Sequence, residues 1–189
     1  MQTMKIMMVS AAIFSLNGFV SAGENLDIKG SFGSELAQTV YPEYGKTSYG
    51  LPKGWIPNLP SWWDAAGKTS LNKIPGTEKY ALQLTSQTKK MSVYYFKKWP
   101  ISPGDKCIVK AIVKGIGTAE LGIIFYPGQG CLSKGFTATE ERTEFTAEIE
   151  IPKVSHCNTV IEQIIVILGV SQGASIEFLD VTAEIVKKE

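Results

Sequence analysis

From residue 80 onward the chain is a succession of short alternating apolar and polar segments separated by turn residues. Seven segments have this character: residues 80–85, 91–96, 106–114, 119–126, 142–151, 161–170 and 175–186. In the fifth, Phe145, Ala147 and Ile149 alternate with glutamates, which is typical of a strand with one dry face and one wet face. Strand–helix–strand spacing is missing, so the sequence predicts an all-β fold: a two-sheet antiparallel β-sandwich of jelly-roll type. In the last segment the apolar spacing predicts a bulge or bend.

The N-terminal residues have the pattern of a secretory signal peptide. Lys5 is followed by an apolar run over residues 6–16, and Val20-Ser21-Ala22 supplies small residues at a cleavage site. The apolar run is too short to span a bilayer, and no later run approaches that length. We therefore expect residues 1–22 to be a signal peptide and residues 23–189 to form a single domain that is secreted or periplasmic.

The charge balance indicates a neutral ligand. The chain has 19 Lys and Arg against 18 Asp and Glu, and removing Lys5 with the signal peptide leaves 18 of each. Such a surface lacks the basic footprint expected of a nucleic-acid-binding protein. Arg142 is the only arginine, although arginine is the side chain preferred for bidentate binding of phosphate or carboxylate.

Three cysteines in an exported chain allow one disulfide and one leftover thiol. Cys131 and Cys157 lie in Gly-rich or polar stretches, whereas Cys107 lies in an alternating apolar segment. We therefore predict a Cys131–Cys157 disulfide and a buried Cys107. A catalytic thiol would need a general base, and the chain has one histidine, His156.

Residues 54–64, GWIPNLPSWWD, hold three of the four tryptophans and two prolines. Such a stretch is either a lid over the core or an aromatic platform for a ligand, since proline disfavours a helix interior or a central strand. Trp62 and Trp63 would point in opposite directions if extended, so one is expected to anchor the loop and the other to face outward. Trp55 and Trp99 are predicted to pack in the core.

Three further side chains are predicted ligand contacts. A pyranose ring stacks its C–H face on an aromatic side chain while its hydroxyls bond to surrounding polar groups. Tyr94 is the candidate from the neighbours Tyr94 and Tyr95, of which one should face outward. Tyr126 stands at the end of a strand where it can rim a cleft. Gln83 is a strand amide that can both donate to and accept from a hydroxyl.

Several motifs occur in an order that resembles a known family. They are NLDIKGSF (25–32), GW (54–55), KYALQLT (79–85), ISPGDKCIVKAIVKG (101–115), AELGIIFY (119–126) and ASIEFLDVTAEI (174–185). In this order they look like the carbohydrate-binding modules of the galactose-binding-like jelly-roll superfamily that accompany xylanases and other glycanases. The resemblance covers nearly the whole mature chain. It implies a noncatalytic module that recognises a neutral poly- or oligosaccharide and requires no cofactor.

Two departures from that family bear on a structural calcium ion. The family's Phe-Glu becomes Phe32-Gly33, and its Asp-Asp-Val becomes Leu179-Asp180-Val181, so each end lacks one acid. The resemblance leaves Asp180 as a calcium ligand candidate, with Asp27 or Glu35 as substitutes for the lost glutamate. We expect these losses to have removed the site.

Two other functions stay open at this stage. The first is a structural or adhesive domain of the same fold that binds a protein partner through the tryptophan-rich loop. The second is a small glycan-active hydrolase, because paired carboxylates can come from distant positions. A Ser-His-Asp hydrolase is not indicated, because the chain has a single histidine, His156, and no nucleophile-elbow motif to supply the serine.

Overall fold

The computed structural model describes residues 23–26, 28, 32–34, 50–58, 66–127 and 130–188. The predicted signal peptide, residues 1–22, lies outside the described residues. The described part of the chain contains eleven strands. They are β1 (Glu24–Asn25), β2 (Trp55–Pro57), β3 (Gly67–Lys73), β4 (Tyr80–Ser86), β5 (Met91–Tyr95), β6 (Trp99–Pro100), β7 (Lys106–Tyr126), β8 (Cys131–Ala138), β9 (Thr143–Glu150), β10 (Gln163–Val170) and β11 (Ser175–Val186).

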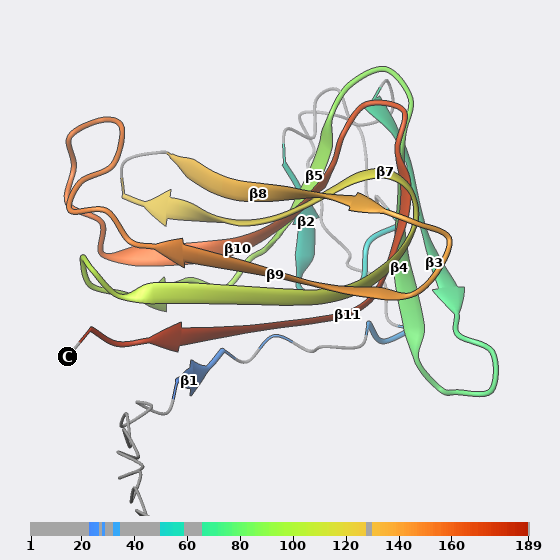
Figure 1. Cartoon of the computed structure of the whole chain (residues 1–189), viewed down its shortest axis with the longest axis horizontal. Coiled ribbons are helices and arrows are strands. Elements are labelled where there is room, and N and C mark those ends of the chain that lie inside the picture. The colour runs from blue at the N-terminus through green and yellow to red at the C-terminus, as the bar shows by residue number, and fades with distance from the viewer. Residues whose placement is uncertain are drawn as a thin grey trace, which may run out of the picture.

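All strand pairs are antiparallel, and the 21-residue strand β7 connects two groups of strands. Residues 106–116 of β7 pair with β11 and β9, and β11 pairs in turn with β1 and β4, which carries β3. Residues 117–126 of β7 pair with β10 and β8, and β10 pairs with β6 and with β5, which carries β2. We call these groups the β11 half and the β10 half. Figure 1 shows β7 crossing the lower part of the molecule, curving round and returning across the upper part.

The curve in β7 lies at two glycines with positive φ, Gly115 (138°) and Gly117 (106°). Such backbone conformations are accessible mainly to glycine. The two segments predicted at residues 106–114 and 119–126 are therefore one strand whose bend transfers it from one half to the other. The predicted bulge is confirmed in β11, where the register with β7 shifts between Phe178 and Asp180.

The inward faces of both halves contribute to one hydrophobic core. In β7 the alternate residues Val109 and Val113 are fully buried, as are Leu121 and Ile123 after the bend. Burial of this apolar surface is the main stabilising term of such a fold. The all-β prediction is confirmed.

Three side chains predicted to be buried lie in this core. Trp55, Trp99 and Cys107 are 1%, 5% and 0% exposed. Burial raises the pKa of the Cys107 thiol to about 12, with a further contribution from the charge of Glu184. Cys107 is therefore a packing residue rather than a nucleophile.

Candidate functional site

An aromatic pocket opens where β2 and β5 meet the N-terminal segment. Its volume is about 430 Å³, and its lining is Phe32, Gly33, Ser34, Pro52, Lys53, Gly54, Trp55, Tyr95 and Phe96. Phe32 bridges to Tyr80 of β4 in the β11 half, while Trp55 pairs with Tyr95 in the β10 half. The pocket therefore lies at an edge of the sandwich where the two halves approach each other.

The rings of this pocket support one another. Trp55 makes edge-type contacts with Phe32 and Tyr95, with ring centroids 5.9 and 5.4 Å apart. Tyr95 stacks on Trp99 at 5.8 Å with an interplanar angle of 14°, and Phe96 lies against Tyr95 at 5.7 Å. Offset and edge-to-face pairs of this kind are favourable arrangements for aromatic rings. The buried rings hold Tyr95 in a fixed orientation, and Phe96, which is 61% exposed, presents its ring to solvent.

Gly54 allows the backbone to approach Tyr95 closely. Its φ is +92°, and a Cβ placed on it would lie 2.5 Å from Cε2 of Tyr95. The N–H of Phe96 donates to the carbonyl of Gly54, which fixes the end of β5 against the turn before β2. The Gly-Trp pair noted in the sequence therefore builds the pocket wall: glycine admits the tyrosine ring, and tryptophan anchors it from the core.

The predicted contacts Tyr94 and Tyr126 lie on the outer face of the β10 half, as the strand register shows. Tyr94 pairs with Ile167 of β10, and Tyr126 pairs with Gln163 of the same strand. Between them, Ile165 and Ile167 are only 8% and 6% exposed, so this part of the face is not an open surface. The tyrosines share a face but do not form one continuous exposed platform.

Tyr126 already has a cationic partner. It is 46% exposed, and Nζ of Lys98 lies 3.2 Å from its ring centroid. This cation–π contact occupies one face of the ring. A sugar stacking on that face would have to displace Lys98.

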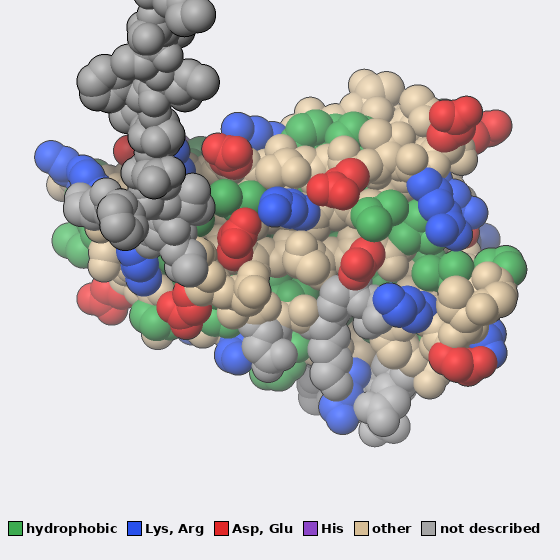
Figure 2. All heavy atoms as spheres, turned by 60° about the horizontal axis from the view of Figure 1, so that its bottom comes forward, with side chains coloured by type: hydrophobic (Ala, Val, Ile, Leu, Met, Phe, Trp, Pro, Cys, Tyr) green, Lys and Arg blue, Asp and Glu red, His purple; other side chains and the backbone are tan. Residues whose placement is uncertain are grey.

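Gln83 of β4 lies elsewhere, on the outer face of the β11 half. This face is turned toward the viewer in Figure 2 and carries interspersed acidic and basic side chains. Its Oε1 accepts hydrogen bonds from Asn72 Nδ2 (2.9 Å) and Ser70 Oγ (3.2 Å), and its Nε2 donates to Ser175 Oγ (3.2 Å). The predicted residues Gln83, Tyr94 and Tyr126 therefore do not form one site, because β4 belongs to one half and the tyrosines to the other.

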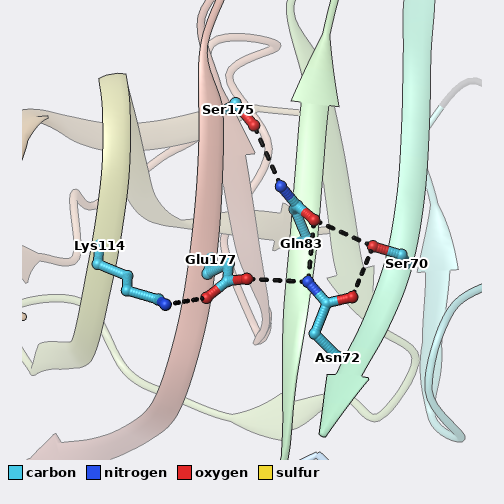
Figure 3. Close-up of polar contacts among 6 residues, drawn as sticks. All are labelled: Ser70, Asn72, Gln83, Lys114, Ser175 and Glu177. Atoms are coloured by element: carbon cyan, nitrogen blue, oxygen red, sulfur yellow. Dashed lines mark hydrogen bonds and ion pairs between the residues drawn. The ribbon is translucent and has the colours of Figure 1, made fainter. Parts of the chain in front are cut away.

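The hydrogen-bond network continues from Gln83 to Glu177 and Lys114 (Figure 3). Asn72 Nδ2 donates to Glu177 Oε1 at 2.8 Å, and Lys114 Nζ lies 2.8 Å from Glu177 Oε2. Burial alone raises the pKa of Glu177, but hydrogen bonds from Lys114 and Asn72 and the charges of Lys114 and Arg142 outweigh it, so the pKa lies below its ordinary value. Glu177 is therefore ionised at neutral pH.

Trp62 and Trp63, the strongest aromatic candidates in the sequence, lie outside the described residues. Their proposed division into an anchor and an exposed ring stays a prediction. Phe32, Tyr95 and Phe96 were not predicted as ligand contacts. The sequence signal that could have found them is the run Tyr94-Tyr95-Phe96 at the end of a strand, since such a run places rings on both faces.

The predicted Cys131–Cys157 disulfide is not present in the structure, in which Cys107 is buried and Cys131 and Cys157 are exposed. Cys131 begins β8 opposite Ile124. Burial raises the pKa of its thiol, which the charge of Lys90 lowers and that of Glu120 raises further. Cys157 lies in a separate turn, where its N–H donates to Ser155 Oγ. The pairing was inferred from both residues being in loops, whereas Cys131 is a strand residue.

The surroundings of Asp180 do not fit a calcium ion. Its Oδ1 accepts the N–H of Val181, and it lines a pocket of about 100 Å³ with Glu144, Thr182 and Lys110. Calcium takes six to eight oxygen ligands, and an ammonium group beside the site opposes it. Within the described ranges no group of three or more His, Cys, Asp or Glu residues could hold a metal ion. Asp27 and Glu35 lie outside those ranges.

Comparison with known proteins identifies the fold. No protein-family model and no curated protein matches the sequence. A cyclase from Fischerella sp. TAU is similar in structure, with TM-score 0.61, 12% identity, and coverage of 89% of this chain and 100% of that one. The CBM22-1 xylan-binding domain of Paenibacillus barcinonensis Xyn10C has TM-score 0.52 and 12% identity, with coverage of 89% and 99%.

The enzymatically active domain of bacteriophage CBA120 tailspike protein 4 is also similar, with TM-score 0.50, 11% identity and coverage of 71% of this chain. The chain spans only a fifth of that tailspike structure. At these identities the comparisons show only that the chain shares its antiparallel all-β fold with these structures, one of which is a xylan-binding domain.

No helix within the described ranges is long and apolar enough to cross a membrane.

Proposed function

We propose that the chain is an exported, noncatalytic carbohydrate-binding module that holds a neutral oligo- or polysaccharide in the aromatic pocket. The observation that carries this proposal is the 430 Å³ pocket walled by Phe32, Trp55, Tyr95 and Phe96, with Phe96 61% exposed. A ring that is supported from behind and open in front offers a stacking surface at a low ordering cost.

The pocket also contains polar groups that suit sugar hydroxyls. Ser34 contributes a hydroxyl and Lys53 an ammonium group to the lining, next to the backbone of Gly33 and Gly54. Ligand sites of this type combine apolar walls with a few polar groups that fix orientation. The balanced charge of the chain agrees with a neutral ligand.

Two further points support the proposal. The fold is shared with a xylan-binding domain, although the sequences are only 12% identical. Residues 1–22 have the pattern of a signal peptide, which suits a protein that meets polysaccharides outside the cell. Trp62 and Trp63 follow β2 closely in sequence, and we expect the outward-facing one of them to extend the binding surface.

A glycan-array screen of the purified protein, followed by titration of each hit, tests the proposal. Phe96→Ala should weaken binding about tenfold, the effect of losing one exposed stacking surface. Val160→Ala is a matched control, since Val160 is 58% exposed and lies outside the pocket. Product analysis on the hits tests the noncatalytic assignment, because a hydrolase would shorten the glycan. Capture of a protein partner with no glycan hit would instead favour the adhesive alternative.

A further inference from the structure

A polar cleft lies on the outer face of the β11 half and shares no lining residue with the aromatic pocket. Its volume is about 290 Å³, and its lining is Gln83, Lys114, Gly115, Ile116, Glu140, Ser175 and Glu177. The lining residues come from β4, the bend of β7, the turn after β8 and the start of β11. The cleft is therefore assembled where β7 leaves this half of the sheet.

The cleft floor is held in place by hydrogen bonds across three strands. Ser70 and Asn72 of β3 bond to Gln83 of β4, and Asn72 also donates to Glu177 of β11. Ser175 accepts from Gln83 and shares a hydrogen bond of 2.9 Å with Thr85. Polar side chains fixed in such a network are oriented before a ligand arrives, which lowers the cost of binding.

The fixed groups retain donors and acceptors for a ligand. Each carboxylate oxygen of Glu177 accepts one of these bonds, and a carboxylate oxygen can accept two. Lys114 has three N–H donors and is 40% exposed, and Gln83 Nε2 carries a second hydrogen. A hydroxyl group, which donates and accepts at once, matches such a mixed surface better than a pure anion or a pure cation does.

Charge and shape narrow the ligand class. The positive charges of Lys114 and Arg142 balance the negative charges of Glu140 and Glu177, so the cleft favours neither sign. Ile116 is 64% exposed at the cleft, the most exposed of the large hydrophobic residues described. An apolar wall beside hydroxyl partners fits the two faces of a sugar ring.

We infer that this cleft is a second saccharide-binding site, which takes vicinal hydroxyls of a neutral sugar between Glu177, Lys114 and Gln83 with Ile116 against the ring. The ligand class rests on the proposed glycan-binding function. Two separate sites would let one molecule bind two glycan segments, which raises avidity on a multivalent surface without any new contact.

NMR titration of isotope-labelled full-length protein with glucose, galactose, mannose and xylose, each in turn, tests the inference. At least one sugar should cause saturable shifts at the amides of Gly115, Ile116 and Ser175. Glu177→Gln, which keeps the side-chain shape, should weaken these shifts about tenfold by removing a charged hydrogen-bond acceptor. Ile116→Ala should also weaken them while leaving the fold unchanged.

The matched control is Glu184→Gln on the same strand. Glu184 forms an ion pair with Lys110 at 3.4 Å, as Glu177 does with Lys114. Its side chain is 26% exposed, close to the 20% of Glu177, but it does not line the cleft. This variant should bind sugar in the cleft as the parent does. Shifts that depend only on Phe96, with none in the cleft, would overturn the second site and keep the proposed function. Cleft shifts with no shifts at the residues of the aromatic pocket would overturn that pocket as a binding site instead. If no sugar shifts either site, both assignments fail.

Discussion

Phe136 and Phe145 stack with their ring centroids 4.8 Å apart and their planes 13° from parallel, although they belong to different halves of the sheet. Phe136 lies in β8 opposite Ala119, and Phe145 lies in β9 opposite Ala111. Both rings are partly buried against the core. The pair therefore joins the two halves along the side where β8 and β9 follow each other in the chain.

Phe145→Ala should lower the free energy of unfolding by about 2 kcal/mol, less than a fully buried phenylalanine because the ring is partly exposed. Urea unfolding measures this change. Thr146→Ala, at the exposed neighbouring position in β9, should stay within about 0.5 kcal/mol of the parent. Equal stability of the two variants would show that the stacked pair does not hold the halves together.

The strand pattern was predictable where each strand has one buried face. The segment at residues 142–151 was recognised because Ala147 and Ile149 are buried and their glutamate neighbours are exposed. β8 was missed because most of its residues are exposed, so its sequence lacks the apolar alternation. β3, with the sequence GKTSLNK, was missed for a similar reason: polar residues that bond to β4 side chains replace the alternation.

The aromatic pocket was harder to predict, because Phe32, Trp55 and Tyr95 are far apart in sequence. Trp55 was expected in the core, and its burial is confirmed, but burial alone does not reveal that its ring supports a pocket. The pocket depends on the pairing of β2 with β5 and on the bridge between Phe32 and Tyr80. Such long-range pairings leave no local pattern in the sequence.

The carboxylate of Asp105 connects the C-terminal segment to the turn before β7. Oδ1 accepts the N–H of Lys188 at 3.0 Å, and Oδ2 accepts the N–H of Ser102 at 2.9 Å and contacts Lys187 Nζ at 3.1 Å. Burial alone raises the pKa of Asp105, but these hydrogen bonds and the charge of Lys187 outweigh burial and lower it. A lowered pKa in the folded state means that the unfolded state takes up the proton more readily.

Asp105 therefore stabilises the fold above the pKa of the unfolded state, near 4, and this contribution is lost as the pH falls through the lower folded pKa. Asp105→Asn should cost about 2 kcal/mol at pH 7, because an amide cannot accept from all three donors. Thermal unfolding of parent and variant over decreasing pH should give Tm values that converge in acid. A difference in Tm that stays constant down to the lowest pH would contradict this role.

The three cysteines should differ in reactivity. Cys107 is fully buried with a pKa of about 12, whereas Cys131 and Cys157 are exposed. An alkylating reagent should therefore modify Cys131 and Cys157 in the native protein and reach Cys107 only after denaturation, since the thiolate is the reactive form. Mass spectrometry of digested samples identifies the modified sites. A single reactive thiol in the denatured, unreduced protein would show instead that a disulfide forms in solution.

The bend of β7 should tolerate no side chain at Gly115. Its φ is +138°, and a Cβ there would lie 2.1 Å from the carbonyl oxygen of Ser175 and 2.9 Å from the Cα of Ile176, both backbone atoms of β11. Gly115→Ala therefore has to push β7 away from β11, and we expect the free energy of unfolding to fall by roughly 3 kcal/mol or more.

Gly76→Ala is the matched control, because Gly76 has φ +75° with no atom within 4 Å of the added Cβ. That variant should lose only about 1 kcal/mol from backbone strain. Urea unfolding separates the two effects, and equal losses would mean that backbone conformation alone, rather than the close approach of β11, requires glycine at the bend.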